Sequence, residues 1–211
     1  MRDGFYDPDV GALFFRGFQD NVPITTILNR TIFIRNKEHS MELTDIQPME
    51  KWIELEKKII EKCQIQSVTF NTEGTRITDY VKWSNRICPV IKGSEKGGPF
   101  ICAVAHMNMA AQAQKTRQAV VEECDAGILK IVVPIFVKDE FVGTAGGCGR
   151  RPADGEVDTF MINKTIGMHV NEIEGLVDDM GSMTPEAAQE CADFVENEIK
   201  HIIEASEAGS Q

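Results

Sequence analysis

Three segments with strand character follow one another closely and constrain the fold more than any other feature. AVVEEC (119–124), ILKIVVPIFV (128–137) and EFVGTAGGC (140–148) are rich in apolar and β-branched residues. The Lys138-Asp139 break leaves room only for a tight hairpin turn, whereas a parallel connection needs about a dozen residues. We therefore expect these strands to pair antiparallel.

Helical patterns flank these strands. Apolar residues recur at helical spacing from Met49 to Cys63, and Phe100–Thr116 is rich in Ala, Gln and Met. Near the end, Thr184 is a favourable N-cap and Pro185 a favourable first helical residue. An antiparallel sheet with helices grouped on it indicates the α+β class.

Shorter elements are expected between these helices and strands. SVTFN (67–71) and RITDYV (76–81) flank a Gly-containing turn and are typical of a β-hairpin. Two further helices are expected, over Asn85–Ile91 and over Val157–Ile166. With the three strands above, the sheet would have about five strands.

The chain divides into three parts by composition. Residues 1–40 begin with an aromatic-rich segment and contain TTILNRTIFIR, which has strand character, so we interpret them as an N-terminal extension of unknown role. Residues 41–206 carry the patterns of the main domain. Residues 207–211 are polar and are expected to form a disordered tail.

The charge balance restricts the partners. Acidic residues number 33 and basic residues 22, for a net charge of −11, which argues against binding to nucleic acid or anionic lipid. No apolar run is long enough to cross a membrane, and the first residues lack the basic segment followed by an apolar segment that is typical of a secretory signal. We therefore expect a cytoplasmic protein with reduced thiols, in which cysteines are ligands, core residues or redox groups rather than disulfides.

Four of the six cysteines form a candidate metal site. Cys88, Cys102, Cys124 and Cys148 fall within one stretch, in polar or Gly-rich surroundings. Thiolates bind zinc or an iron–sulfur cluster, and four of them would complete either site. Their spacing matches no local metal motif, so only the fold could bring them together.

The other two cysteines have a simpler interpretation. Cys63 and Cys191 each lie on the apolar face of an expected helix. Free cysteine is among the residue types most often buried. We therefore expect both to be reduced core residues.

A small-molecule pocket is expected along the Phe100–Thr116 helix. His106 lies one helical turn after Cys102, where it could bind a metal or donate to a sulfur, or could simply be a structural histidine. The two methionines of this helix suit soft-metal binding, pocket lining or core filling. The residues proposed to line a ligand pocket are Trp83, Phe100, His106, Met107 and Met109.

Catalytic motifs are not evident. GTAGGCGRR (143–151) is Gly-rich but lacks the Gly-Lys-Ser/Thr end of a phosphate loop. Neither a nucleophile elbow nor a dinucleotide fingerprint occurs. We expect no catalysis, with thiol chemistry at Cys124 as the alternative.

The chain resembles the PocR-type sensory domain, a variant of the PAS and GAF sensor folds, from about Met41 to Ile203. The resemblance rests on WSNRICPVI, PFICAVAHMNMAAQA, VVEECDAGILKIVVPIFV and EFVGTAGGCG. Cys88, Cys102 and Cys124 fall where the family pattern expects cysteine, and Cys148 is typical of a subgroup. The resemblance implies an antiparallel PAS/GAF-like sheet of about five strands with flanking helices.

The resemblance also implies a function. Such domains are sensors proposed to bind small diols and related compounds, and they usually accompany DNA-binding or signalling domains. We expect a stand-alone cytoplasmic sensory module that binds a small ligand, a cysteine-ligated metal or iron–sulfur centre, or both. It would signal to a protein partner or a second copy. The alternatives are an iron–sulfur or zinc redox protein and a thiol-dependent enzyme.

Overall fold

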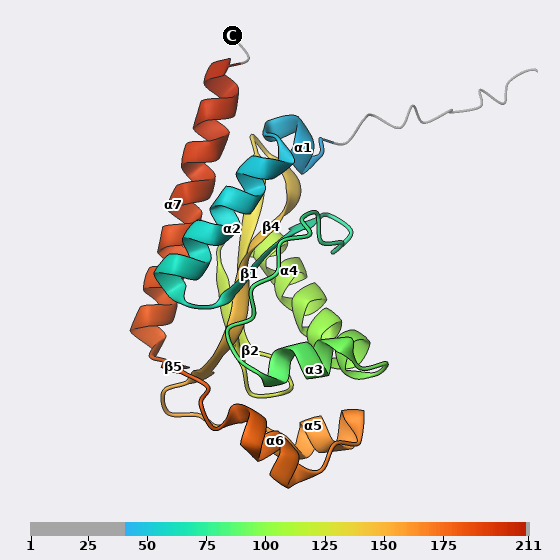
Figure 1. The fold of residues 1–211 in the computed structure, drawn as a ribbon. Helices are drawn as coiled ribbons and strands as arrows, with labels where there is room; N and C mark the ends of the chain where they lie inside the picture. The colour runs from blue at the N-terminus through green and yellow to red at the C-terminus, as the bar shows by residue number, and fades with distance from the viewer. Residues whose placement is uncertain (1–40, 210–211) are drawn as a thin grey trace, which may run out of the picture. The chain divides into compact units, whose positions relative to one another are not determined.

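The computed structural model describes residues 41–209, which form a central sheet with helices on both faces (Figure 1). The expected N-terminal extension, residues 1–40, lies outside the described residues. The strands are β1 (Gln66–Asn71), β2 (Val120–Glu123), β3 (Leu129–Val137), β4 (Glu140–Pro152) and β5 (Ser182–Met183). The helices are α1 (Leu43–Ile46), α2 (Met49–Cys63), α3 (Ile87–Gly93), the π-helix η2 (Gly98–Ala103), α4 (Val104–Thr116), α5 (Thr159–Ile166), α6 (Val170–Val177) and α7 (Pro185–Gly209).

The strand order confirms the predicted α+β fold. Strands β1, β4, β3 and β2 lie side by side in that order, and each pair of neighbours is antiparallel. The short β5 pairs in parallel with the end of β4 and completes the five strands. The Lys138-Asp139 turn joins β3 to β4 as a hairpin, as its length predicted.

The fifth strand is not the expected one. Residues 76–81 form a single bridge, Phe70 to Arg76, instead of a second hairpin arm. Side chains hold this segment instead of a strand ladder, because the Thr78 hydroxyl donates to Glu56 Oε1 at 2.7 Å and Arg76 donates to the Tyr80 carbonyl. The segment therefore runs beside the sheet as an irregular connection to α3.

One face of the sheet carries the main core. The apolar sides of α2 and α7 pack there on alternate residues of β3, with Trp52, Val195 and Ile135 almost fully buried. The predicted N-cap of α7 is confirmed, since the Thr184 hydroxyl accepts from the amide of Ala187. This helix continues to Gly209 and so includes part of the expected disordered tail.

A disulfide joins Cys63 of α2 to Cys191 of α7. Both residues are buried, as predicted, but the expectation that they stay reduced is wrong for this structure. The two helices lie side by side on the sheet, so their buried faces bring together two cysteines that are 128 positions apart. Helical periodicity predicts the faces, but the helix pairing depends on the tertiary fold.

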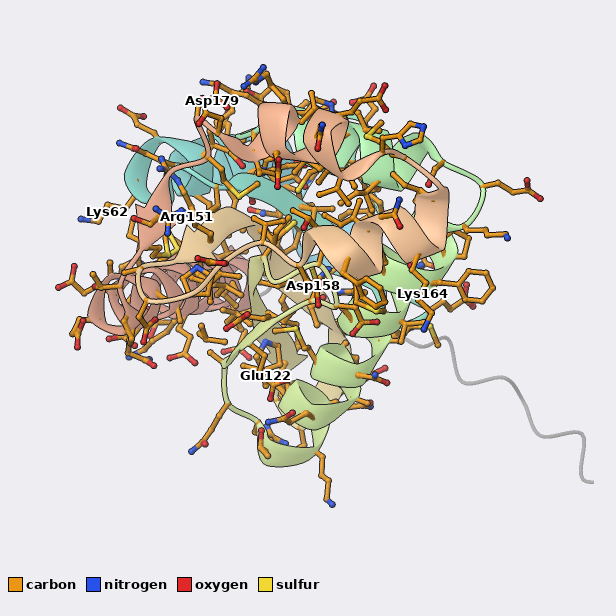
Figure 2. The ribbon with its side chains drawn as sticks, turned by 90° about the horizontal axis from the view of Figure 1, so that it is seen from below. Lys62, Glu122, Arg151, Asp158, Lys164 and Asp179 are labelled. Atoms are coloured by element: carbon orange, nitrogen blue, oxygen red, sulfur yellow. A yellow bond between two sulfur atoms is a disulfide. The ribbon has the colours of Figure 1, made fainter. Side chains whose placement is uncertain are left out.

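The opposite face of the sheet is covered by α3, η2 and α4 (Figure 1). The expected helix over 100–116 starts earlier, at Gly98, as a turn of π-helix before α4. Helix α5 begins only at Thr159, because the Asp158 carboxylate accepts from the Met161 amide at 2.7 Å and caps it (Figure 2).

Helix α6 was not expected from the sequence. It packs with α5 at the end of the sheet near α3, where Ile173 joins a second apolar cluster with Ile87 and Ile162. Asp179 lies just after α6 (Figure 2). It pairs with Arg86, just before α3, at 3.1 Å. Within residues 41–209, no helix combines the length and hydrophobicity that a membrane span requires.

Candidate functional site

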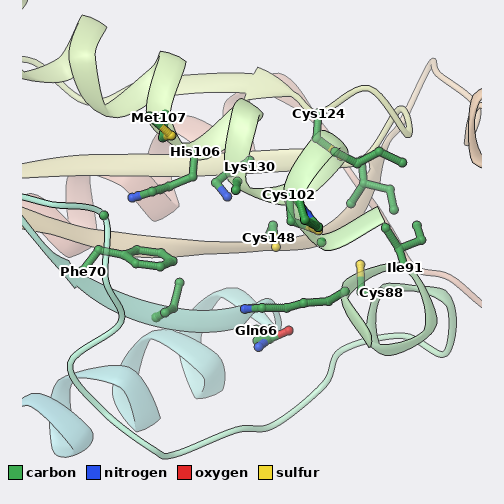
Figure 3. Close-up of a pocket in the computed structure, with 18 of the residues that line it drawn as sticks. Gln66, Phe70, Cys88, Ile91, Cys102, His106, Met107, Cys124, Lys130 and Cys148 are labelled. Carbon is green, nitrogen blue, oxygen red and sulfur yellow. The ribbon is translucent and has the colours of Figure 1, made fainter. Parts of the chain in front are cut away.

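A cavity of about 490 Å³ lies between the sheet and the helices α3, η2 and α4 (Figure 3). Its volume falls in the range of small-molecule sites, roughly 300–1,000 Å³. Apolar side chains such as Val68, Ile91 and Ile128 make up much of its lining. All four free cysteines also line it, although they come from four separate parts of the fold.

Strand register builds the floor of this cavity. Lys130 of β3 lies directly opposite Cys148 of β4, which in turn lies opposite Gln66 of β1. Because directly opposed residues of antiparallel strands point to the same face, the three side chains form one polar row across the sheet. The cavity therefore has a lysine, a thiol and an amide on its floor.

The next row is apolar and contains a glycine. Gly146 of β4 lies between Val132 of β3 and Val68 of β1. A Cβ at Gly146 would come within 2.1 Å of the Ile131 carbonyl oxygen, and its φ of +152° is one that side chains rarely adopt. Only glycine therefore fits at this point of β4, where a small side cavity of about 10 Å³ adjoins the main one.

Asn85 holds the cysteine of α3 beside the floor. Its Oδ1 accepts from the Cys88 amide at 2.8 Å, and its Nδ2 donates to the Gly149 carbonyl at 2.8 Å and to the Cys88 sulfur at 3.2 Å. This one amide joins the start of α3 to the residue that follows Cys148. The spacing of Asn85 and Cys88 was visible in the sequence, but the hydrogen bond from Asn85 to β4 was not.

The thiols of Cys88 and Cys148 share a hydrogen bond, so their ionisation is linked. This bond and burial raise the pKa of Cys88. The same bond, together with the charges of Lys130 and Lys92, lowers the pKa of Cys148 to about 6 despite burial. The two thiols therefore titrate as a coupled pair, in which ionisation of one sulfur opposes ionisation of the other.

The remaining two thiols are held neutral. Burial raises the pKa of Cys102 to about 11, and burial also raises that of Cys124. A negative charge on Cys148 opposes ionisation at both, so these three thiols interact electrostatically. In the part of the chain that the structure describes, no three His, Cys, Asp or Glu side chains are arranged to hold a metal ion.

His106 lies in the wall of the cavity formed by α4. Its ring stacks on that of Phe70, with ring centres 3.8 Å apart, and its Nδ1 has no hydrogen-bond partner among residues 41–209. Burial lowers the pKa of His106 to about 3, with further contributions from Lys130 and Lys92. The imidazole is therefore neutral at pH 7.

Lys130 is a site residue that sequence reasoning missed, as it also missed Gln66 in the same row. Its side chain points into the cavity, only 7% of the residue is exposed, and it forms no hydrogen bond or ion pair with any other described residue (Figure 3). A lone lysine inside the apolar run ILKIVVPIFV was the available signal. Lysine is seldom buried without a partner, so this position indicates a function.

The predicted pocket residues have different positions in the structure. Trp83, His106 and Met107 line the cavity. Met109 is 2% exposed and packs in a separate cluster with Val132, so it does not line the cavity. Phe100, in the π-helical turn η2, is 62% exposed and also lies outside the lining.

Comparison with protein families gave one match. The family model described as the sensory domain found in PocR matches residues 45–207, which include every residue that lines the cavity. A search of curated proteins found no match, and neither did a search of solved structures.

Proposed function

The chain belongs to the family of PocR sensory domains, and on that premise we propose that it binds a small molecule in the cavity between the sheet and α3, η2 and α4. The cavity itself is the observation that supports this function. It has the size of a ligand site, a largely apolar lining and a few polar groups, such as the Lys130 ammonium and His106 Nδ1, that have no hydrogen-bond partner among residues 41–209. We propose a sensory role and no catalytic one.

Strand β3 offers a route from the cavity to the surface. Its residues alternate, so that Lys130 and Val132 face the cavity while Ile131 and Val133 pack in the core beneath α7. A ligand that favours one position of β3 would shift the packing of α7. We propose that α7 passes this change to a protein partner or a second copy, and we expect a cytoplasmic location.

A matched pair of variants tests the cavity. Thermal unfolding is followed with a panel of small diols and small acids, in the native protein, in Ala103→Trp and in Ala111→Trp. Both alanines are exposed and lie about two helical turns apart, but only Ala103 lines the cavity. Compounds that raise the Tm of the native protein should lose this effect in Ala103→Trp and keep it in Ala111→Trp. Equal stabilisation of both variants would place binding elsewhere.

A thiolate-ligated iron–sulfur cluster is the second candidate for the same cavity. The supporting observation is that Cys88, Cys102, Cys124 and Cys148 all line it. A single zinc ion has less support, since no three ligands are arranged around one point within the described residues. A cluster needs its ligands spread around several irons, and four cysteines match that requirement in number.

Anaerobic purification tests this second candidate. The absorption spectrum and the iron, sulfide and zinc contents are measured for the native protein and for Cys148→Ser. A brown native protein with iron and sulfide, both lost in the variant, would support the cluster. A folded, colourless and metal-free native protein would rule out the iron–sulfur cluster.

A further inference from the structure

No carboxylate among residues 41–209 compensates the charge of Lys130. The residue is 7% exposed, and no described carboxylate lies within ion-pair distance of it. Glu73 is the one acidic residue among those described that line the cavity, and it is exposed to solvent. Keeping an ammonium group in such a place is costly unless an opposite charge accompanies it. A group that enters the cavity can provide that charge.

The field inside the cavity favours negative charge. Lys130 and Lys92 both lower the pKa of His106, which disfavours a positive imidazole. The surroundings of Lys130 and Lys92 therefore favour a negative group over a positive one, in a protein whose net charge is −11.

Cys148 compensates Lys130 only in part. Its sulfur already takes part in the hydrogen bond with Cys88, and sulfur is a weak acceptor. A carboxylate has two strong acceptor oxygens and forms charge-assisted hydrogen bonds with an ammonium group. His106 lies in the same part of the cavity, beside the small side cavity that Lys130 also lines (Figure 3). Its ring and the Thr144 hydroxyl there each have a buried atom without a partner among residues 41–209.

We infer that the cavity binds an organic monoanion, with its carboxylate at Lys130 beside His106 and its apolar body against Ile101, Ile128 and Val68. This inference rests on the proposed ligand-binding function and gives the ligand's chemical class. A neutral diol would satisfy hydrogen bonds in the cavity, but it would leave the ammonium charge uncompensated. The apolar part of the lining selects for a hydrocarbon chain, since burying it contributes in proportion to its area.

The test compares acids with neutral compounds of the same shape. Affinities are measured by calorimetry for lactate against 1,2-propanediol, and for butyrate, hexanoate and octanoate against the alcohols of the same chain length. The protein is first shown to be metal-free. The native protein should prefer the acid of each pair, and Lys130→Met should weaken acid binding about tenfold or more, as expected for loss of a charged hydrogen bond, while leaving the alcohols nearly unchanged.

Two further variants separate charge from packing. Lys130→Arg keeps the positive charge and should retain the preference for acids. Lys92→Met removes an exposed lysine of the same cavity and should weaken acid binding less than Lys130→Met does, because solvent screens exposed charges.

The outcomes distinguish this inference from the proposed function. If diols and alcohols bind as well as the acids, or if Lys130→Met keeps the preference for acids, the inference is wrong and the cavity remains a ligand site. If no compound of either kind binds to the folded native protein, both the ligand-binding function proposed for this cavity and the inference are overturned.

Discussion

Replacement of His106 by Phe should remove part of the acid sensitivity of the fold. The pKa of His106 is lowered from 6.5 to about 3, first by burial and then by Lys130 and Lys92. Below about pH 6.5 the unfolded chain takes up a proton that the folded protein does not bind until about pH 3. Stability therefore falls as the pH decreases through this window, with a limiting slope of about 1.4 kcal/mol per unit. From pH 7 to pH 5 the loss is about 2 kcal/mol.

Urea unfolding at the two pH values measures this effect. The quantity of interest is the change in the free energy of unfolding between pH 7 and pH 5, compared between the native protein and His106→Phe. The phenyl ring keeps the stacking on Phe70 but cannot titrate. The native protein should lose about 2 kcal/mol more than the variant over this range. His201→Gln removes an exposed histidine as the control and should behave like the native protein.

An equal pH dependence in the native protein and in His106→Phe would refute the reasoning. It would mean that His106 takes up its proton in the folded state as readily as in the unfolded chain. In that case His106 is not held neutral, and the cavity is not the positive, dehydrated environment that the inference on anion binding requires.

Two further predictions concern the scaffold. The Cys63–Cys191 disulfide closes a loop of 128 residues, so chain entropy predicts a stabilisation of about 5 kcal/mol. A reductant should lower the urea midpoint of the native protein but not that of a variant with both cysteines changed to Ala. An unchanged midpoint on full reduction would contradict this. Gly146→Ala should destabilise the fold by about 2 kcal/mol or more, because the added Cβ would meet the Ile131 carbonyl. Gly175→Ala, on an open helix surface, is the control and should be neutral or stabilising by up to about 1 kcal/mol. Similar unfolding midpoints for the two variants would count against the strained β4 geometry.

Local patterns predicted the elements that depend on neighbouring residues. The short Lys138-Asp139 break required a hairpin, and the N-cap and proline at Thr184 and Pro185 marked the start of α7. Such signals act over a few residues, so they survive any change in the rest of the fold. The prediction of a strand over 76–81 was wrong, because the Glu56 carboxylate of helix α2 accepts a hydrogen bond from Thr78.

The cysteines show both the reach and the limit of sequence reasoning. Their types and surroundings singled out Cys88, Cys102, Cys124 and Cys148, and all four line the cavity. The sequence could not show that Asn85 links α3 to β4, because the two are far apart in the chain. The sequence segments that resemble the sensory domain likewise identified the family, but they did not show which residues line the cavity.

The sequence by itself determined the α+β class, the family and the faces of the long helices, because each depends on periodicity or on local residue chemistry. Only the tertiary structure decided that Lys130, Cys148 and Gln66 form one row on the cavity floor. It also decided that Cys63 meets Cys191. Strand order and helix pairing set these contacts, and both depend on the burial of apolar surface across the whole domain rather than on any one segment.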